Sequence, residues 1–217
     1  MSCYVIVDFE MCNVPFRAQA DEFKWRHEII QIGAVLLDKA LKVCDTFMTY
    51  VHPQYGKIDQ VIENLTCITN DDVSAAPDCR ETLSEFVNWL PPNTILVSWS
   101  KSDETQIRNE VKEKSINIPK LDSLLNSWID CQKTFSDIMG SERCYNLVEA
   151  LNISSLDYDE NVHNALTDAK NTALLFAKME NEKGGAFKLS PYISIGGNEN
   201  SGYTPFANLL KAFSEVK

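Results

Sequence analysis

The sequence predicts a mixed α/β protein. Three apolar segments rich in β-branched residues lie close together near the N-terminus, at residues 2–9, 28–37 and 42–51, and this composition is typical of strands. Helical and strand-like patterns then alternate along the chain up to about residue 179. Neighbouring strands followed by such an alternation predict a mixed sheet covered by helices.

The first three strands differ in their expected burial. Residues 28–37 form a nearly continuous apolar run, which predicts a central strand covered on both faces. Residues 42–51 are more mixed and predict a strand nearer an edge. The link between these two strands is short enough for a hairpin.

The later elements are predicted from periodicity and helix-stopping residues. Residues 78–90 carry apolar side chains at helical spacing and end at two prolines, which predicts a helix. The other predicted elements are a fourth strand at 93–98, a charged helix at 103–114, a fifth strand at 126–132, and helices at 146–151 and 165–179.

The distribution of glycine predicts where the compact domain ends. Five of the eight glycines follow residue 183, so we expect a compact domain over residues 1–183 and a tail over residues 184–217. The tail has one helical apolar pattern, which predicts a short amphipathic helix. This helix would dock on its own core, join two subunits of a homo-oligomer, or cover a substrate. The pattern consists of Phe206, Leu209, Leu210 and Phe213.

Composition excludes some classes of protein. The chain has 217 residues, of which 44% are hydrophobic, as expected for an ordinary globular protein. Its net charge of −11 argues against a protein that coats long duplexes, but not against an enzyme that acts on nucleic-acid ends. The nearest approach to a basic patch is either a solvated loop or a phosphate-contacting one, and it consists of Arg17, Lys24, Arg26 and His27.

Several features predict a cytoplasmic protein. No apolar run is long enough to span a membrane, and the N-terminal segment does not resemble a secretory signal. The seven cysteines are an odd number and lack zinc-binding spacing, so we expect reduced thiols.

Asp8 and Glu10 lie at the end of the first predicted strand. Because side chains alternate across a strand, the two carboxylates leave the same face, roughly 6.5 to 7 Å apart. Two such groups repel each other, and a hard cation with oxygen ligands removes that cost. The pair therefore predicts a metal site, unless both residues lie at a frayed strand end and face water.

Asp103 and Asp168 add two more carboxylates. Asp103 follows the predicted fourth strand, near the sheet edge where α/β proteins usually place their chemistry, although it is also suited to be a helix N-cap. Asp168 lies within the predicted helix at 165–179. Together with Asp8 and Glu10, these residues predict a site for two divalent metal ions that hydrolyses phosphodiester bonds.

His163 precedes Asp168 by five residues. On one regular helix the two side chains would be about 140° apart, so we expect the helix to begin near Asn164 and His163 to project from the preceding loop. A loop histidine beside a metal site can accept a proton from water, because its pKa is close to neutral. The alternative is a histidine that is only solvated.

These five positions resemble a known set of motifs. In order and spacing they are similar to the three motifs of the DEDDh 3′–5′ exonucleases, the superfamily of ribonuclease T and polymerase proofreading subunits. Two longer strings resemble more narrowly the histone-mRNA exonuclease branch, whose bacterial members include KapD-like proteins. They are Val7-Asp-Phe-Glu-Met-Cys12 and His27-Glu-Ile-Ile-Gln-Ile-Gly-Ala-Val35. A third string, Leu65-Thr-Cys-Ile-Thr69, has Cys67 where the superfamily has glycine.

The resemblance implies a ribonuclease-H-like five-stranded sheet of order 3-2-1-4-5 and two Mg²⁺ or Mn²⁺ ions. It implies that Asp8 bridges both ions, that Glu10 and Asp168 complete the first, and that Asp103 holds the second. His163 would be the general base. The substrate would be the 3′ end of single-stranded RNA or DNA, and the product a 5′-mononucleotide.

Residues that contact the substrate are also implied by the resemblance. Met11 and Cys12 would meet the terminal nucleoside, and Leu65 or Thr66 its base or sugar. Trp99 would stack on a base, as aromatic side chains do with single strands, or pack in the core. Two other functions remain open: a regulatory or interaction protein that retains the fold, and an oligonuclease acting on very short oligonucleotides.

Overall fold

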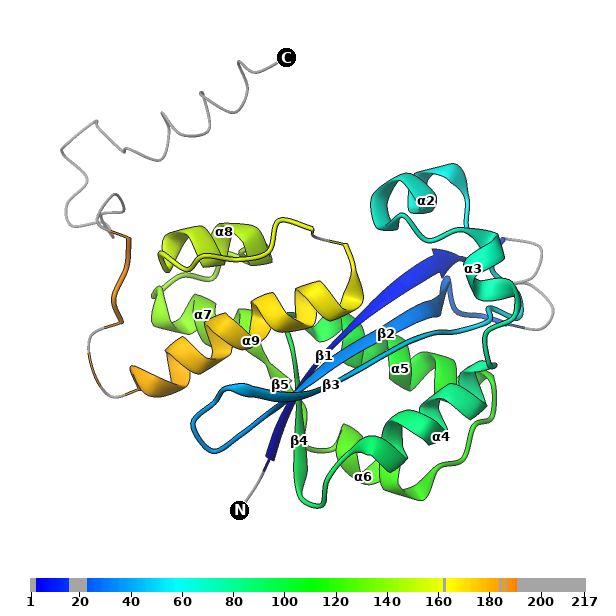
Figure 1. The fold of residues 1–217 in the computed structure, drawn as a ribbon, viewed down its shortest axis with the longest axis horizontal. Coiled ribbons are helices and arrows are strands. Elements are labelled where there is room, and N and C mark those ends of the chain that lie inside the picture. Colours follow the sequence, from blue (N-terminus) through cyan, green and yellow to red (C-terminus); the bar gives the residue numbers. More distant parts are fainter. Residues whose placement is uncertain (1–2, 16–22, 162, 184, 186, 191–217) are drawn as a thin grey trace, which may run out of the picture.

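The chain folds around a five-stranded sheet with helices on both faces (Figure 1). The protein is represented by a computed structural model, which describes residues 3–15, 23–161, 163–183, 185 and 187–190. Arg17 and the amphipathic pattern predicted over residues 206–213 lie outside the described residues.

The strands lie in the order β3-β2-β1-β4-β5, which confirms the predicted order. β1 pairs antiparallel with β2 and parallel with β4, and β2 pairs antiparallel with β3, so the sheet is mixed. The bounds are β1 (Cys3–Asn13), β2 (His27–Leu37), β3 (Val43–Tyr50), β4 (Thr94–Ser98) and β5 (Ile129–Asp130).

β1 is the central strand, and its alternating side chains divide between the two faces of the sheet. Val7 and Phe9 belong to the hydrophobic core on one face, and Ile6 belongs to the core on the other. Asp8 and Glu10 therefore follow Ile6 on the second face. The apolar part of β1 thus carries both carboxylates to the same side of the sheet.

Helices form a layer on each side of the sheet. Figure 1 shows α9 crossing one side, together with α7 and α8, while α4 and α6 lie on the other. α2 and α3 lie near the C-terminal end of β1. The bounds are α2 (Gln60–Thr66), α3 (Asn70–Ser74), α4 (Cys79–Trp89), α5 (Lys101–Glu113), α6 (Pro119–Leu125), α7 (Cys131–Ile138), α8 (Leu147–Ile153) and α9 (Ala165–Asn181).

Two parts of the predicted element order are wrong. The four helices α2, α3, α6 and α7 were not predicted, and the fifth strand predicted over residues 126–132 has only the two residues of β5. The strand is short because the Asp130 side chain accepts the backbone N–H of Lys133 over 2.8 Å and so caps α7. The chain therefore turns into a helix immediately after β5.

The chain remains packed for some residues after α9. Phe187 and Leu189 contact the core beneath α7, α8 and α9, and the backbone N–H of Ser190 donates to the Ile153 carbonyl over 2.7 Å. The domain boundary predicted near residue 183 stays a prediction. Among the helices in the described part of the chain, none combines the length and the apolar character needed to cross a membrane.

Candidate active site

Asp103 is joined directly to the strand that carries Asp8 and Glu10. β1 pairs with β4 only as far as Ile6, which leaves that edge of β1 open at Phe9. The Asp103 Oδ1 atom accepts the backbone N–H of Phe9 over 3.2 Å, although 94 positions separate the two residues. Because Phe9 lies between Asp8 and Glu10, this hydrogen bond fixes the start of α5 beside both carboxylates.

The N-cap alternative for Asp103 is wrong. Ser100 is the N-cap of α5, and its hydroxyl accepts the backbone N–H of Ser102 over 3.2 Å. Asp103 lies in the first helical turn and is only 4% exposed. One oxygen of its carboxylate therefore contacts the sheet, and the other accepts the Ser102 hydroxyl of its own first turn over 3.4 Å.

His163 and Asp168 are held together by a backbone hydrogen bond. α9 begins at Ala165, with Asn164 as its N-cap, so His163 projects from the preceding loop as predicted. The backbone N–H of His163 donates to the Asp168 Oδ2 atom over 2.8 Å. His163 has a left-handed backbone with φ of 64°, and its residue is exposed.

The five predicted residues come together at one place on the sheet. One ligand atom each from Glu10, His163 and Asp168 lies within 4.8 Å of the others. Asp8 is close enough to Asp103, Glu10 and Asp168 for the charge of each to raise its pKa. Side chains from β1, α5 and α9 thus form one acidic cluster, although Asp8 and Asp168 are 160 positions apart in the sequence.

Burial raises the pKa of every carboxyl in this cluster, and repulsion by the other carboxylates of the cluster raises it further at Asp8 and Glu10. Burial is the largest cause for Asp8, whose pKa lies well above its ordinary value, followed by the charges of Asp103, Glu10 and Asp168. For Glu10, burial and then the charges of Asp168 and Asp103 raise the pKa to about 8.

Hydrogen bonds oppose this rise at the other two carboxyls. Burial raises the pKa of Asp103 to about 7 although the Phe9 N–H favours the charged form. Burial also raises the pKa of Asp168, against the effect of the His163 N–H. Both carboxylates are thus oriented by a backbone N–H and destabilised by their surroundings.

The cluster fits divalent metal ions. Among the residues that the structure describes, no lysine or arginine forms an ion pair with any of the four carboxylates. Buried carboxylates without a counterion are costly, and hard cations such as Mg²⁺ bind carboxylate oxygens. The donor set and the missing counterion therefore both suit a metal site.

Two residues that the sequence patterns did not identify help to place α9. The Gln31 Oε1 atom accepts the backbone N–H of Ala165 over 2.9 Å. Gly33 leaves room for the same turn, because a Cβ there would lie 2.1 Å from the Ala165 carbonyl carbon. A glycine and a glutamine inside an apolar strand were the available signals, since an isolated glycine in a strand often marks close backbone contact.

The predicted substrate-contacting residues of β1 are both covered by the protein. Met11 is partly buried and packs against the core on the face of Val7 and Phe9. Cys12 is fully buried in a small core that includes Ile30, and burial raises the pKa of its thiol to about 12. The Cys12 thiol is therefore protonated at neutral pH.

α2 carries Leu65 and Thr66, the other two residues predicted to contact the substrate. Asn13 Nδ2 donates to the α2 cap Asp59 over 3.3 Å, which ties α2 to the end of β1. Leu65 is 47% exposed, whereas Thr66 is buried and its hydroxyl donates to the Ile62 carbonyl over 2.9 Å. Leu65 is thus the accessible member of the pair.

Trp99 lies in the core on the α7 side of the sheet. Its ring centroid is 6.2 Å from that of Phe135, and the residue is only 8% exposed.

Cys67, which replaces the glycine of the related motif, ends α2 in a left-handed conformation with φ of 59°. Cys67 thus adopts a left-handed conformation, which glycine adopts most readily.

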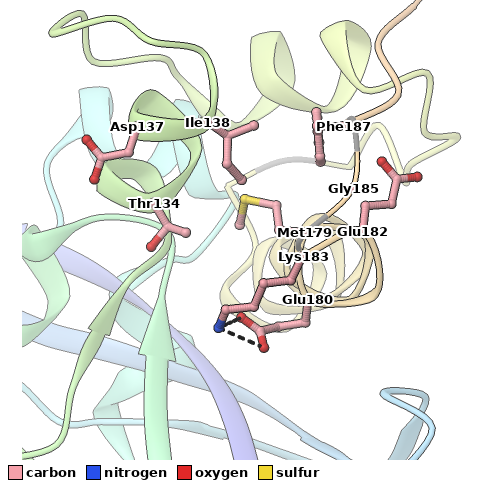
Figure 2. A pocket seen from close by; sticks show the side chains of 9 residues that line it. All are labelled: Thr134, Asp137, Ile138, Met179, Glu180, Glu182, Lys183, Gly185 and Phe187. Carbon is pink, nitrogen blue, oxygen red and sulfur yellow. Dashed lines mark hydrogen bonds and ion pairs between the residues drawn. The ribbon is translucent and has the colours of Figure 1, made fainter.

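A cavity of about 490 Å³ lies elsewhere, between α7 and the C-terminal end of α9 (Figure 2). Met179, Ile138 and Phe187 supply apolar side chains, and Glu180 forms an ion pair with Lys183 at its edge. Glu180 follows Asp168 by 12 residues, or about 18 Å along the helix. The cavity is thus separate from the acidic cluster.

Comparisons with known proteins agree with this architecture. A family model described as “Exonuclease” matches residues 5–176. The 3′–5′ exoribonuclease 1 of Rattus norvegicus is 26% identical over 185 residues, which cover 78% of this chain and 52% of that protein. The DNA polymerase III subunit epsilon of Aquifex aeolicus (strain VF5) is 27% identical over 196 residues, which cover 88% of this chain and 87% of that protein.

A solved structure shows the same fold. The nuclease domain of 3′hExo, a DEDDh family member, bound to rAMP, has a TM-score of 0.72 and 24% identity, covering 87% of this chain and 96% of that chain. The predicted ribonuclease-H-like sheet is thereby confirmed. The chain spans about half the length of the rat exoribonuclease. With a family model that covers most of its length, the chain belongs to the exonuclease family.

Proposed function

We propose that the chain is a metal-dependent 3′–5′ exonuclease that removes 5′-mononucleotides from single-stranded RNA or DNA. The observation that carries this proposal is the gathering of four carboxylates beside an exposed histidine, with no ion pair to a lysine or arginine within the part of the chain that the structure describes. Family membership supports the same reaction class. A protein that only bound nucleic acid would gain nothing from such a cluster, because its negative charge repels phosphate.

Four carboxylates would hold two Mg²⁺ or Mn²⁺ ions: Asp8, Glu10, Asp103 and Asp168. When bound, such ions neutralise phosphate charge and stabilise the attacking and leaving oxygens of an in-line displacement. The protein's own contribution is orientation. Asp103 is fixed by the Phe9 N–H, and Asp168 by the His163 N–H.

His163 would accept the proton of the attacking water. Its side chain is exposed and lies beside Glu10 and Asp168, so water and substrate can reach it. An imidazole exchanges protons near neutral pH, and general-base catalysis of this kind contributes about 10²- to 10⁴-fold. Leu65, as the exposed one of the two contacts predicted on α2, is the best placed of the predicted contacts to meet a base.

The relatives support both kinds of nucleic acid as substrates. One is named an exoribonuclease and the other a subunit of a DNA polymerase. An oligonuclease acting on very short substrates is a second candidate, favoured by the net charge of −11, which offers little attraction to long strands. Homo-oligomer formation through the tail, a cytoplasmic location and a place in the KapD-like branch stay predictions.

The decisive experiment is a ladder assay with 5′-labelled RNA and DNA of 2, 5, 10 and 20 or so nucleotides, in Mg²⁺ or Mn²⁺. Shortening one nucleotide at a time from the 3′ end, abolished by EDTA, is the expected result. Asp8→Asn should fold normally yet lose about 100-fold or more in rate, because removing even an outer partner of a metal ligand costs about 10- to 100-fold. Full turnover in Asp8→Asn would overturn the proposal, and cleavage of only the shortest substrates would favour the oligonuclease.

A further inference from the structure

Gln31 is a buried polar residue in the middle of the apolar strand β2. Its side chain is fully buried, and its Oε1 atom accepts the backbone N–H of Ala165 over 2.9 Å. Ala165 is the first residue of α9, so this N–H has no partner within the helix. The hydrogen bond joins strand and helix across 134 positions of sequence.

Gly33 brings the same turn of α9 into direct contact with the strand. A Cβ at this position would lie 2.1 Å from both the Ala165 carbonyl carbon and the Leu166 nitrogen, a distance that no side chain tolerates. Gln31 and Gly33 are two positions apart and share one face of β2. Together they define where α9 starts and how close it lies to the sheet.

This contact lies beside the acidic cluster. In the β1–β2 ladder, Gly33 is paired with Asp8 and Gln31 with Glu10. Asp168 follows Ala165 by less than one helical turn. A shift of the helix start would therefore move Asp168, and with it the His163 N–H that the Asp168 carboxylate accepts.

Local capping does not fix this position by itself. Asn164 accepts the backbone N–H of Thr167 over 3.2 Å, which shapes the first turn but does not connect it to another element. Gln31 supplies the side-chain hydrogen bond from the sheet to that turn. The Asn164 cap thus shapes the first turn of α9, whereas the Gln31 hydrogen bond fixes the position of that turn on the sheet.

We infer that Gln31 is a positioning residue: by accepting the Ala165 N–H, it holds Asp168 and His163 opposite Asp8 and Glu10 without contacting the substrate. Its predicted effect on rate rests on the proposed function, whereas its effect on α9 does not. A purely structural role would lower stability and leave the geometry of the cluster unchanged.

The test compares Gln31→Leu, which removes the acceptor, with Gln31→Glu, which retains an oxygen at the same place near the positive end of α9. Gln31→Leu should weaken Mn²⁺ binding, measured by calorimetry without nucleic acid, by about 10- to 100-fold. It should lower kcat by about 100-fold with KM within about twofold, because the reacting groups are misplaced by a fraction of an ångström to 1 Å. Gln31→Glu should restore kcat to within about tenfold of wild type.

Amide hydrogen exchange at Ala165 provides a measurement that needs neither metal nor substrate. Exchange should accelerate at least about tenfold in Gln31→Leu and return toward wild type in Gln31→Glu, since an unbonded N–H exchanges without an opening step. Val87→Ala, a core truncation in α4 on the other side of the sheet, is the matched control. It should lower the unfolding temperature without changing Mn²⁺ affinity.

Three results would overturn the inference. The first is a folded Gln31→Leu with wild-type Mn²⁺ affinity and kcat, and the second is unchanged exchange at Ala165. The third is exchange at Ala165 that is as fast in Gln31→Glu as in Gln31→Leu, which would assign the effect to packing rather than to the hydrogen bond. If Gln31→Leu does not fold, Gly33→Ala displaces the same turn and should weaken Mn²⁺ binding alike. A wild type that binds Mn²⁺ but cleaves nothing would contradict only the proposed function.

Discussion

His163 combines an exposed imidazole with a backbone conformation that few side chains adopt. Its φ of 64° falls in the left-handed region, where asparagine, aspartate and histidine are the best tolerated residues after glycine. The same backbone supplies the N–H that orients Asp168. His163 therefore provides a proton acceptor with its side chain and orients the metal ligand Asp168 with its backbone. A substitution that tests the first role has to preserve the second.

His163→Asn separates them. Asparagine tolerates the left-handed backbone and keeps the N–H that Asp168 accepts, but it cannot serve as a base near neutral pH. Hydrolysis should fall by about 10²- to 10⁴-fold in single-turnover assays while Mn²⁺ binding is retained. A variant that kept the wild-type rate would remove His163 from the reaction.

Cys67 shows what the missing glycine costs. The left-handed conformation destabilises a non-glycine residue by about 1–2 kcal/mol. Glycine avoids this strain but loses more chain entropy on folding, which offsets about 0.5–1 kcal/mol of the gain. Cys67→Gly should therefore raise the free energy of unfolding by about 0.5–1 kcal/mol, measured by urea denaturation. Cys44→Gly is the control, because Cys44 is an exposed cysteine in the extended strand β3. That change should lower stability, and a gain there would undermine the explanation.

At the scale of elements, strand alternation and helix capping explain which predictions succeeded. Asp8 and Glu10 were placed correctly because apolar neighbours define the faces of β1, and His163 because a histidine and an aspartate five residues apart cannot share a helix face. Four helices of five to eight residues were missed, although the seven-residue α8 was predicted, because such short elements are stabilised by their contacts and caps more than by periodicity.

The role of Gln31 and Gly33 in placing α9 could not be predicted from the sequence, for a different reason. Both lie in an apolar run that predicts a central strand, and nothing in that run specifies which helix packs on it. The contact depends on Ala165, more than 130 positions away. Long-range placement of this kind is a property of the tertiary fold, whereas the identity of the carboxylates follows from local pattern.

A buried ion cluster joins β2 to α5. The Lys114 ammonium is 2.6 Å from Glu28 and 2.7 Å from Glu110, and both carboxylates are fully buried. Glu28 also accepts backbone N–H groups from residues 54–56, and Glu110 accepts that of Ile29. The cluster thus ties the helix that carries Asp103 to the sheet and to the loop before α2.

Lys114→Met should be strongly destabilising. It leaves two buried carboxylates without their cation, a change that typically costs about 3–5 kcal/mol. Chemical denaturation should show this loss, whereas Lys133→Met, which breaks the exposed pair with Asp137, should change stability by less than about 1 kcal/mol. Similar values for the two variants would mean that the Lys114 cluster contributes little.

At the scale of the whole molecule, the acidic cluster makes stability depend on pH and metal. The folded-state pKa of Glu10 is about 8 and that of Asp103 about 7, whereas both are near 4 in an unfolded chain. Below about pH 4 these carboxyls are protonated in both states and cost nothing. As the pH rises toward 8 the unfolded chain loses its protons first, so the folded state is progressively destabilised.

The metal-free protein should therefore have a lower unfolding temperature at pH 8 than at pH 5.5, measured by differential scanning fluorimetry with EDTA. Glu10→Gln should flatten this dependence, because it removes one of the titrating groups. Added Mn²⁺ should raise the unfolding temperature most at pH 8, since metal ions bind deprotonated carboxylates. An unfolding temperature that rose with pH in EDTA would contradict the arrangement of the cluster.

The wide separation of the ligands along the chain also bears on how the protein is made. Asp8 leaves the ribosome first and Asp168 follows 160 residues later, yet both belong to the same centre. Synthesis proceeds at about 5–20 residues per second, so many seconds pass before the last ligand emerges and its helix can reach the strand. Under the proposed function, a growing polypeptide would therefore lack a complete metal site until α9 has emerged and packed against β1.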